Sequence, residues 1–165
     1  MFLVGAKARL LIVGQALGRR VHETGIPWND PSGDKLRAWL QMDRAAFYDT
    51  SRIAILPAGL CFPGTGASGD LPPRPECAPL WHPRFRAAMP GIGLTLLVGS
   101  YAHKYYLKEN VRASLTETVR GYRDYLPEFF PLPHPSPRNR LWLKNNPWFA
   151  RQVIPALRRS VNALI

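Results

Sequence analysis

The residues best suited to chemistry lie in the run His134-Pro135-Ser136-Pro137-Arg138-Asn139, which follows a short apolar stretch over 129–132. Its imidazole can donate or accept a hydrogen bond, and its guanidinium presents a planar fork that matches phosphate. Because proline fixes φ and favours extended geometry in the preceding residue, neither a helix nor a regular strand can continue here. We therefore expect a rigid loop with His134 at its start and Arg138 at its tip. Proline-rich loops with one histidine are also common structural features. The rest of the chain must therefore show whether this loop is functional or only structural.

A second candidate loop, Gly14-Gln15-Ala16-Leu17-Gly18, follows the apolar run Leu10-Leu11-Ile12-Val13. Glycines at the carboxyl end of a strand let backbone amides approach a ligand, and open α/β sheets place their sites there. The spacing is not that of a dinucleotide-binding fingerprint and no helical pattern follows it, so an ordinary tight turn is the alternative. Trp28 lies in a turn-rich loop over 24–34, where it is either a stacking surface or a core anchor.

The elements that would position these loops alternate between strands and helices. Continuous apolar runs predict buried strands at residues 10–13, 53–56, 94–98 and 129–132. Apolar spacing and capping residues predict helices that begin at Ser32, near Leu80, at Ser100, at Ser114 and at Asn146. We expect the Pro- and Gly-rich stretch over 57–79 to be a long loop without secondary structure. This alternation indicates an α/β domain with a mainly parallel sheet, in which both candidate loops emerge at the same edge.

Composition limits the class of protein. The 165 residues suffice for a single domain, residues 1–165, that buries a core without disulfides or metals. A net charge of +11 and a pI near 10.4 are typical of a polyanion-binding domain, although a solubility feature or a generally basic proteome would also explain them.

In the final helix, Arg151, Arg158 and Arg159 are expected to form a solvated basic face. No apolar run could span a bilayer and no signal-peptide pattern is present, so we expect a cytoplasmic monomer, nucleoid-associated in a prokaryote.

The chain resembles the uracil-DNA glycosylase superfamily in three motifs. They are the Gly14-Gln15-Ala16-Leu17-Gly18 loop, the run Thr24-Gly25-Ile26-Pro27-Trp28, and His134-Pro135-Ser136. The segment Leu96-Leu97-Val98-Gly99-Ser100-Tyr101-Ala102 is similar to the third strand and helix start of the family. The run from His134 to Asn139 is most like the single-strand-selective monofunctional class. The middle of the chain is more similar to the iron–sulfur class, through Cys61, Pro63, Gly64, Pro75, Glu76, Cys77 and Leu80.

This resemblance covers most of the chain and implies both a fold and an activity. The implied fold is a three-layer α/β/α sandwich around a short, mainly parallel four-stranded sheet. The implied activity is hydrolysis of the N-glycosidic bond of uracil, or of another deaminated or damaged base, after the base is flipped from DNA into a pocket. DNA that contains such a base is therefore the expected partner.

The resemblance also assigns roles by position. The base-pocket positions are Gly14, Ala16, Trp28 and Pro57, with Trp28 as the stacking surface. His134 would hydrogen-bond the carbonyl of the departing base, as an oxyanion hole does, assisted by backbone amides of the 14–18 loop. The DNA-binding and wedge positions are Ser136, Pro137, Arg138, Asn139 and Arg140.

The chain departs from the family pattern at three points. Active members carry Asp, Asn or Glu in the first motif, whereas this chain has Gln15 and Ala16; because Gln15 orients water but cannot accept a proton, Asp30 is the expected substitute. Pro57 stands where the family's asparagine reads uracil, which leaves the identity of the base open. The iron–sulfur class uses four cysteines. This chain has only Cys61 and Cys77, expected as free thiols near each other, so no cluster or metal is expected.

Three functions fit these features. The first is a monofunctional DNA glycosylase of the base-excision repair type. The second is a non-catalytic nucleic-acid-binding relative that kept His134 and the wedge but lost the group that positions water. The third is a binder of small molecules or nucleotides that uses the same loops without DNA. Formation of an abasic product separates the first from the others, and steeply salt-dependent binding without product favours the second.

Overall fold

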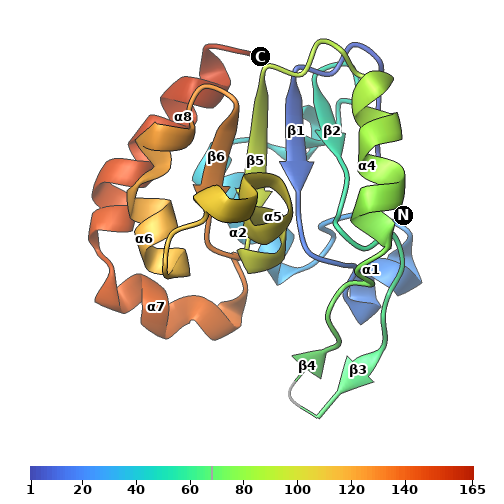
Figure 1. Cartoon of the computed structure of the whole chain (residues 1–165), viewed down its shortest axis with the longest axis horizontal. Helices are drawn as coiled ribbons and strands as arrows, with labels where there is room; N and C mark the ends of the chain where they lie inside the picture. Colours follow the sequence, from blue (N-terminus) through green and yellow to red (C-terminus); the bar gives the residue numbers. More distant parts are fainter. Residues whose placement is uncertain (68) are drawn as a thin grey trace.

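A four-stranded parallel sheet forms the middle layer of the computed structural model, which describes residues 1–67 and 69–165 (Figure 1). The strands are β1 (Leu10–Val13), β2 (Ile53–Ile55), β5 (Leu94–Val98) and β6 (Phe129–Leu132), in the order β2-β1-β5-β6. In register, Leu10 lies opposite both Ile53 and Leu94, and Thr95 lies opposite Phe129. The expected parallel sheet is confirmed, and the four predicted strands agree with it to within one residue.

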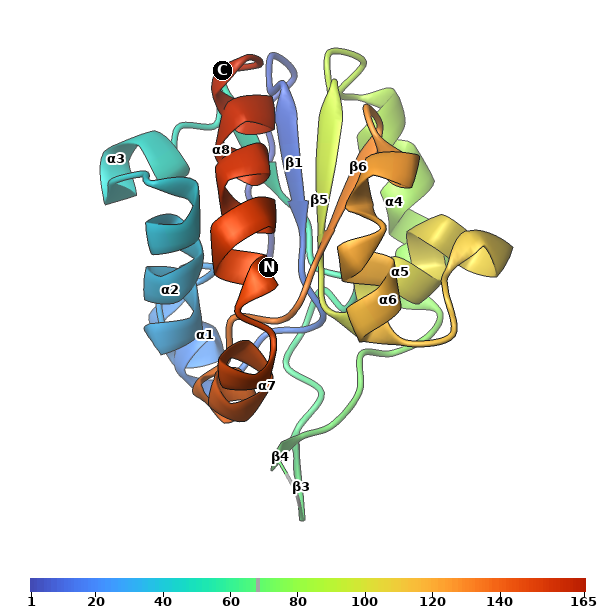
Figure 2. The ribbon, with the colours of Figure 1, turned by 90° about the vertical axis from the view of Figure 1, so that its left-hand side faces the viewer.

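Helices cover both faces of the sheet, as a three-layer α/β/α sandwich requires (Figure 2). The α-helices are α1 (Arg19–Thr24), α2 (Pro31–Leu40), α3 (Arg44–Phe47), α4 (Cys77–Ala87), α5 (Ser100–Leu107), α6 (Leu115–Arg120), α7 (Arg140–Asn145) and α8 (Ile154–Asn162). The shorter helical turns are η1 (Lys108–Asn110), η2 (Tyr122–Tyr125), η3 (Pro137–Asn139) and η4 (Phe149–Val153), the last of them a π-helix. Alternate strand residues face opposite layers: Leu10 and Ile12 pack with α2 and α8, whereas Leu11 and Val13 pack with α5.

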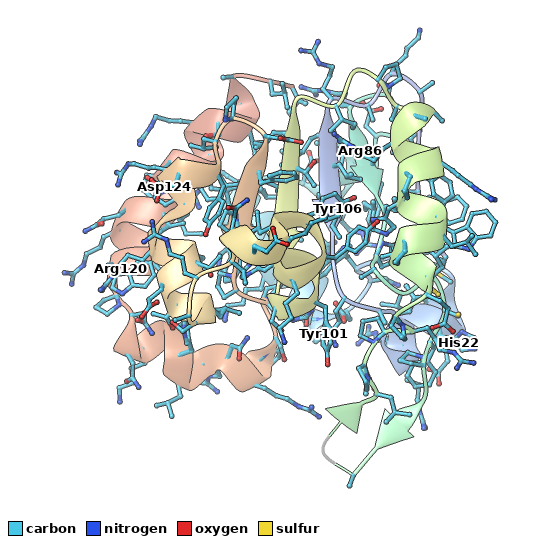
Figure 3. All side chains as sticks on the ribbon, in the orientation of Figure 1. His22, Arg86, Tyr101, Tyr106, Arg120 and Asp124 are labelled. Carbon is cyan, nitrogen blue, oxygen red and sulfur yellow. The ribbon has the colours of Figure 1, made fainter. Side chains whose placement is uncertain are left out.

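Histidine and tyrosine connect α4 to α5 in the second layer. Tyr106 reaches from α5 toward α4 (Figure 3), and its hydroxyl lies 2.9 Å from Nδ1 of the buried His82. Nε2 of His82 lies 3.0 Å from the carbonyl oxygen of Pro57, which can only accept, so Nε2 carries the proton and Tyr106 donates to Nδ1. Burial lowers the pKa of His82, so the ring is neutral at pH 7. The loop after β2 is thereby fixed to this layer.

Several elements were not predicted, among them the one-turn helix α3. The hairpin of β3 (Thr65–Gly66) and β4 (Gly69–Asp70) lies within the stretch expected to be loop. Helix α1 directly follows the first glycine loop, and α7 directly follows the proline-rich run. Helix α1 buries a single residue, Val21, and α7 buries none, so neither carries the apolar stripe from which periodicity is read.

Several predicted helix starts were wrong. Asp30, not Ser32, caps α2, and its side chain accepts a hydrogen bond from the Gly33 amide. Gly99 rather than Ser100 precedes α5, and α4 starts at Cys77 and continues through Pro83. Asn146 ends α7, and its side-chain oxygen accepts from the indole of Trp148 instead of a backbone amide. The cap at Ser114 is confirmed, because its hydroxyl accepts from the Glu117 amide.

The basic face expected on the last helix is not fully solvated. Arg158 of α8 donates to two carbonyls at the end of α2, those of Trp39 at 2.9 Å and Ala38 at 3.1 Å. These carbonyls lie in the last turn of α2, where the Ala38 carbonyl also accepts from the Gln41 amide at 3.2 Å, so the guanidinium completes the C-terminus of α2. Arg151 and Arg159 are exposed as expected.

His103 joins β5 to β6 at the edge where both candidate loops begin. Its Nε2 lies 3.0 Å from the carbonyl oxygens of Leu97 and Leu132, so this nitrogen carries the proton. Its Nδ1 is buried without a hydrogen-bond partner in the described part of the chain. Burial lowers the pKa of His103 from 6.5 to about 4.

This buried imidazole predicts acid sensitivity. Between pH 7 and 4.5 the unfolded chain binds a proton at this position and the folded chain does not. The free energy of unfolding therefore decreases as the pH is lowered. We expect the His103 ring to account for a loss of about 2–3 kcal/mol in the free energy of unfolding over that range. Urea unfolding at both pH values should show a smaller loss for His103→Gln than for the wild type or for a variant at the exposed His22. An equal loss in all three would contradict the assignment.

Candidate functional site

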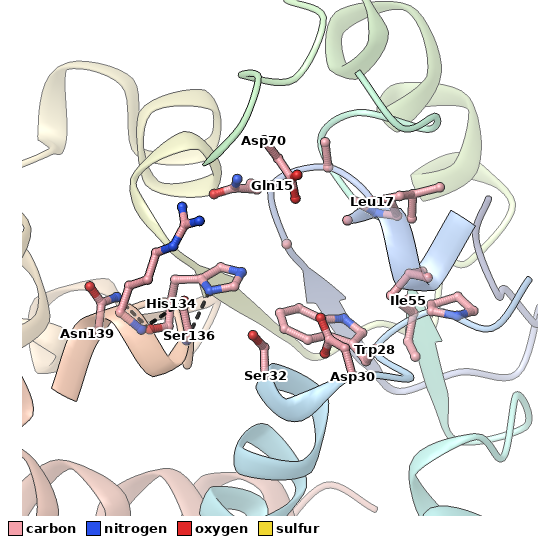
Figure 4. Close-up of a pocket in the computed structure, with 17 residues that line it drawn as sticks. Gln15, Leu17, Trp28, Asp30, Ser32, Ile55, Asp70, His134, Ser136 and Asn139 are labelled. Atoms are coloured by element: carbon pink, nitrogen blue, oxygen red, sulfur yellow. Dashed lines mark hydrogen bonds between the residues drawn. The ribbon is translucent and has the colours of Figure 1, made fainter. Parts of the chain in front are cut away.

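A pocket of about 340 Å³ opens at the carboxyl ends of the strands, where loops from distant parts of the chain meet (Figure 4). The predicted site residues that line it are Gly14, Gln15, Ala16, Trp28, Asp30, Pro57, His134, Ser136, Arg138 and Asn139. Pro137 and Arg140 do not line it and are exposed beside it. The expected meeting of the 14–18 and 134–139 loops at one sheet edge is therefore observed.

His134 begins a loop that is hydrogen-bonded to itself. The backbone amide of Ser136 donates to Nδ1 of His134 at 3.2 Å, and the Asn139 side chain donates to the His134 carbonyl at 2.7 Å. The Ser136 hydroxyl accepts from the Arg138 amide at 3.2 Å. Because a backbone N–H can only donate, Nδ1 must accept, and the proton of the neutral ring lies on Nε2.

The charge state of His134 follows from its surroundings. Burial lowers the pKa of the ring, and the nearby carboxylate of Asp30 opposes this shift. The imidazole is therefore neutral at pH 7, with an Nε2–H donor that points toward the cavity (Figure 4). A neutral N–H donor of this kind can stabilise negative charge by a hydrogen bond while it keeps its proton.

Trp28 covers His134. The two rings stack with centroids 5.6 Å apart and planes inclined by 28°. The opposite loop accommodates the indole through Gly14, where a Cβ would lie 2.9 Å from Cζ2 of Trp28. Trp28 is half-buried: it packs partly against the core and also lines the pocket.

Asp30 serves the helix and the pocket at once. As N-cap of α2 it accepts a 2.8 Å hydrogen bond through Oδ1 from the Gly33 amide. The same side chain lines the pocket and acts electrostatically on His134. A carboxylate fixed in this way can hold water and accept its proton, whereas the Gln15 amide can hold water but cannot accept the proton.

The first glycine loop is fixed from behind by the loop after β2. Amides of Ala58 and Gly59 donate to the carbonyls of Gly14 and Gln15, at 3.0 and 2.7 Å. Pro57 lies at the start of that loop and contributes only an apolar ring to the cavity. Nothing in the Pro57 side chain can read the hydrogen-bonding edge of a base.

The hairpin supplies a pocket residue that the sequence did not reveal. Asp70 of β4 lines the cavity, and its Oδ2 would lie 3.2 Å from a Cβ at Gly18. Arg138 also meets the hairpin, since a Cβ at Gly69 would lie 2.0 Å from one guanidinium nitrogen. The expected wedge residue therefore packs on the hairpin and not on the core. The remaining lining residues are Leu17, Gly18 and Pro27, which belong to the predicted motif loops, and Val21, Ser32 and Ile55, which were not predicted to line a pocket.

The two cysteines are free thiols, with Cys61 exposed and Cys77 half-buried. Both act electrostatically on the amino group of Met1, so both lie near it.

Among the described residues no group of three or more His, Cys, Asp or Glu side chains could hold a metal ion. No helix in the same residues is long and apolar enough to cross a membrane.

Comparisons with known proteins agree with this architecture. The sequence matches the uracil DNA glycosylase superfamily over residues 2–158. The fold is similar to the solution NMR structure of a candidate uracil DNA glycosylase from Methanosarcina acetivorans, with a TM-score of 0.53 and 16% sequence identity. That similarity covers 97% of this chain and 95% of the other, so the two share a fold over nearly their whole length.

Proposed function

Because the chain belongs to the uracil DNA glycosylase superfamily, we propose that it hydrolyses the N-glycosidic bond of uracil, or of another deaminated or damaged base, flipped out of DNA. The observation that carries this proposal is the neutral His134 ring, whose Nε2–H faces the cavity under Trp28. Asp30 lines the same cavity. The product would be an abasic site, formed without a covalent intermediate by a monofunctional enzyme.

The proposed reaction uses a donor and a carboxylate in one pocket. As the bond between base and deoxyribose breaks, its electron pair leaves with the base, and negative charge develops on the base carbonyl. Nε2–H of His134 would stabilise that charge by a hydrogen bond. Asp30 would hold a water molecule, whose oxygen adds to C1′ of the sugar while its proton passes to the carboxylate. Trp28 would limit the tilt of the base, and Ser136 would bind a flanking phosphate.

A screen of oligonucleotides tests this proposal and identifies the base. Duplexes and single strands bearing uracil, hypoxanthine, xanthine or an oxidised pyrimidine would be incubated with the protein. Alkali-labile abasic sites would then be measured. We expect cleavage with at least one of these bases, lost in His134→Ala. Absence of product from every substrate would contradict the proposal.

A non-catalytic nucleic-acid-binding relative is the second candidate. The observation that favours it is the lining of the pocket by Gln15, Ala16 and Pro57, because the family resemblance implies Asp, Asn or Glu in the first motif and an asparagine that reads the base. Such a protein would bind DNA with an affinity that falls steeply with salt and would form no abasic product.

Arg138→Ala is expected to reduce activity more on duplex DNA than on single strands. Arg138 lies at the pocket rim, where a wedge would fill the gap left by a flipped base. Unstacking a paired base costs a few kcal/mol, whereas a base in a single strand needs little help. Single-turnover rates on matched duplex and single-stranded substrates measure the ratio, with the exposed Arg159→Ala as the control. Equal losses on both substrates would contradict the wedge role.

A further inference from the structure

A buried cation lies behind Trp28. Arg37 of α2 is only 5% exposed, and its Nη1 donates to the Trp28 carbonyl at 3.2 Å and to the Tyr48 hydroxyl at 3.3 Å. The Tyr48 hydroxyl in turn donates to the carbonyl of Pro27 at 2.7 Å. Rings of Phe47 and Tyr48 flank the guanidinium at 5.3 and 5.8 Å. Two successive backbone carbonyls of the Trp28 turn are therefore held by one Arg–Tyr pair.

The Trp28 turn needs such support because its backbone is strained. Trp28 has φ of 59°, in the left-handed region, which costs an L-residue with a bulky side chain about 1–3 kcal/mol. Its carbonyl oxygen is pressed against Gly33, where a Cβ would lie only 1.7 Å away. Strained conformations of this kind persist when surrounding contacts over-determine them.

The ion pair of Arg37 does not explain why its guanidinium is buried. Its partner, Asp34, is 2.6 Å away but its side chain is 73% exposed. Because solvent screens a carboxylate this exposed, the pair alone does not account for burying an arginine. Within the described part of the chain, the other hydrogen bonds of the guanidinium go to the Trp28 carbonyl and to the Tyr48 hydroxyl.

We propose that Arg37 and Tyr48 are positioning residues for the pocket: by holding the Pro27 and Trp28 carbonyls, they keep the indole stacked on His134. The catalytic part of this inference rests on the proposed function, but the ring geometry does not. Loss of the pair lets the turn relax, tilts the indole away from His134 and opens the imidazole to water.

The first test measures His134 itself and needs no activity. NMR titration of His134 is carried out on the wild type, Tyr48→Phe, Arg37→Met and Arg158→Met. Arg158 is the matched control because it also donates to two backbone carbonyls of α2, away from the pocket. The pKa of His134 should rise toward 6.5 in Tyr48→Phe and Arg37→Met as its burial decreases, and stay unchanged in Arg158→Met.

Tyr48→Phe decides the outcome, because removing the Arg37 charge would by itself raise the pKa of His134. Asp30, the charged group that acts on the His134 ring, is the same in every variant. An unchanged His134 titration in Tyr48→Phe, or an equal shift in Arg158→Met, would overturn the proposal. Because this measurement uses no substrate, failure of the glycosylase proposal would leave it intact.

The second test is kinetic. Tyr48→Phe should lower kcat/KM about tenfold, the effect of one buried hydrogen bond of roughly 1.4 kcal/mol. In a Trp28→Ala background the same change should have almost no further effect, because the residue it positions is gone. Additive losses would show that Tyr48 acts only on general stability and would overturn the positioning role.

Discussion

His134→Ala is expected to lower the rate of base release about 10²- to 10³-fold, the usual cost of removing one donor from an oxyanion-type site. The reason is geometric: Nδ1 is committed to the Ser136 amide, so Nε2–H is the donor that the ring offers to the cavity. Single-turnover kinetics on the best substrate from the screen measure the loss, with His22→Ala, an exposed position, as the control. A loss confined to KM would show that the ring binds the base without stabilising its departure.

The pH profile of the wild type provides an independent check on the same ring. Protonation would place a hydrogen on Nδ1 against the Ser136 amide and break that bond. Because burial lowers the pKa of His134, the neutral form persists below pH 6.5. The contribution of the ring should therefore be constant from pH 8 to 6.5 and be lost only at lower pH. A loss that begins above pH 7 would contradict the neutral-donor assignment.

Asp30→Asn is expected to slow turnover about 10²- to 10⁴-fold, the range for removing a general base. Asparagine caps a helix as well as aspartate does, so the hydrogen bond from Gly33 and the free energy of unfolding should be retained. Single-turnover rates measure the role of Asp30 in activating water, and urea unfolding measures its role as a helix cap.

A matched control exists for this change. Asp43 caps α3 in the same way, accepting from the Ala46 amide at 2.8 Å, and it does not line the pocket. Asp43→Asn should leave both rate and stability unchanged, whereas Asp30→Ala should lose activity and about 1 kcal/mol of stability. Wild-type turnover in Asp30→Asn would remove Asp30 as the group that activates water.

The sheet and the meeting of the two motif loops could be predicted because their signals are local. Leu10–Val13 and Leu94–Val98 are buried on both faces, so the first is an unbroken apolar run and the second is interrupted only by Thr95. Parallel strands place their carboxyl ends at one edge of the sheet. This rule alone predicts that His134 and Gly14 lie near each other, and both line the pocket.

What could not be predicted depends on contacts between distant residues. Asp70 is a single acid in a Pro- and Gly-rich stretch, and only the fold of the hairpin brings it over Gly18. Arg37 has the sequence pattern of an ordinary surface arginine three residues after Asp34. Its burial follows from the packing of Phe47 and Tyr48, which lie on a later segment.

The cap at Asp30 also bears on how such a protein could change over generations. One oxygen of its carboxylate starts α2, and asparagine would do so equally well. A single-base mutation of that codon would therefore leave a folded protein with the same pocket lining but no carboxylate at that position to accept a proton from water. Under the proposed function, this one exchange, which selection on folding would not oppose, would separate an active glycosylase from a protein that binds the same base without releasing it.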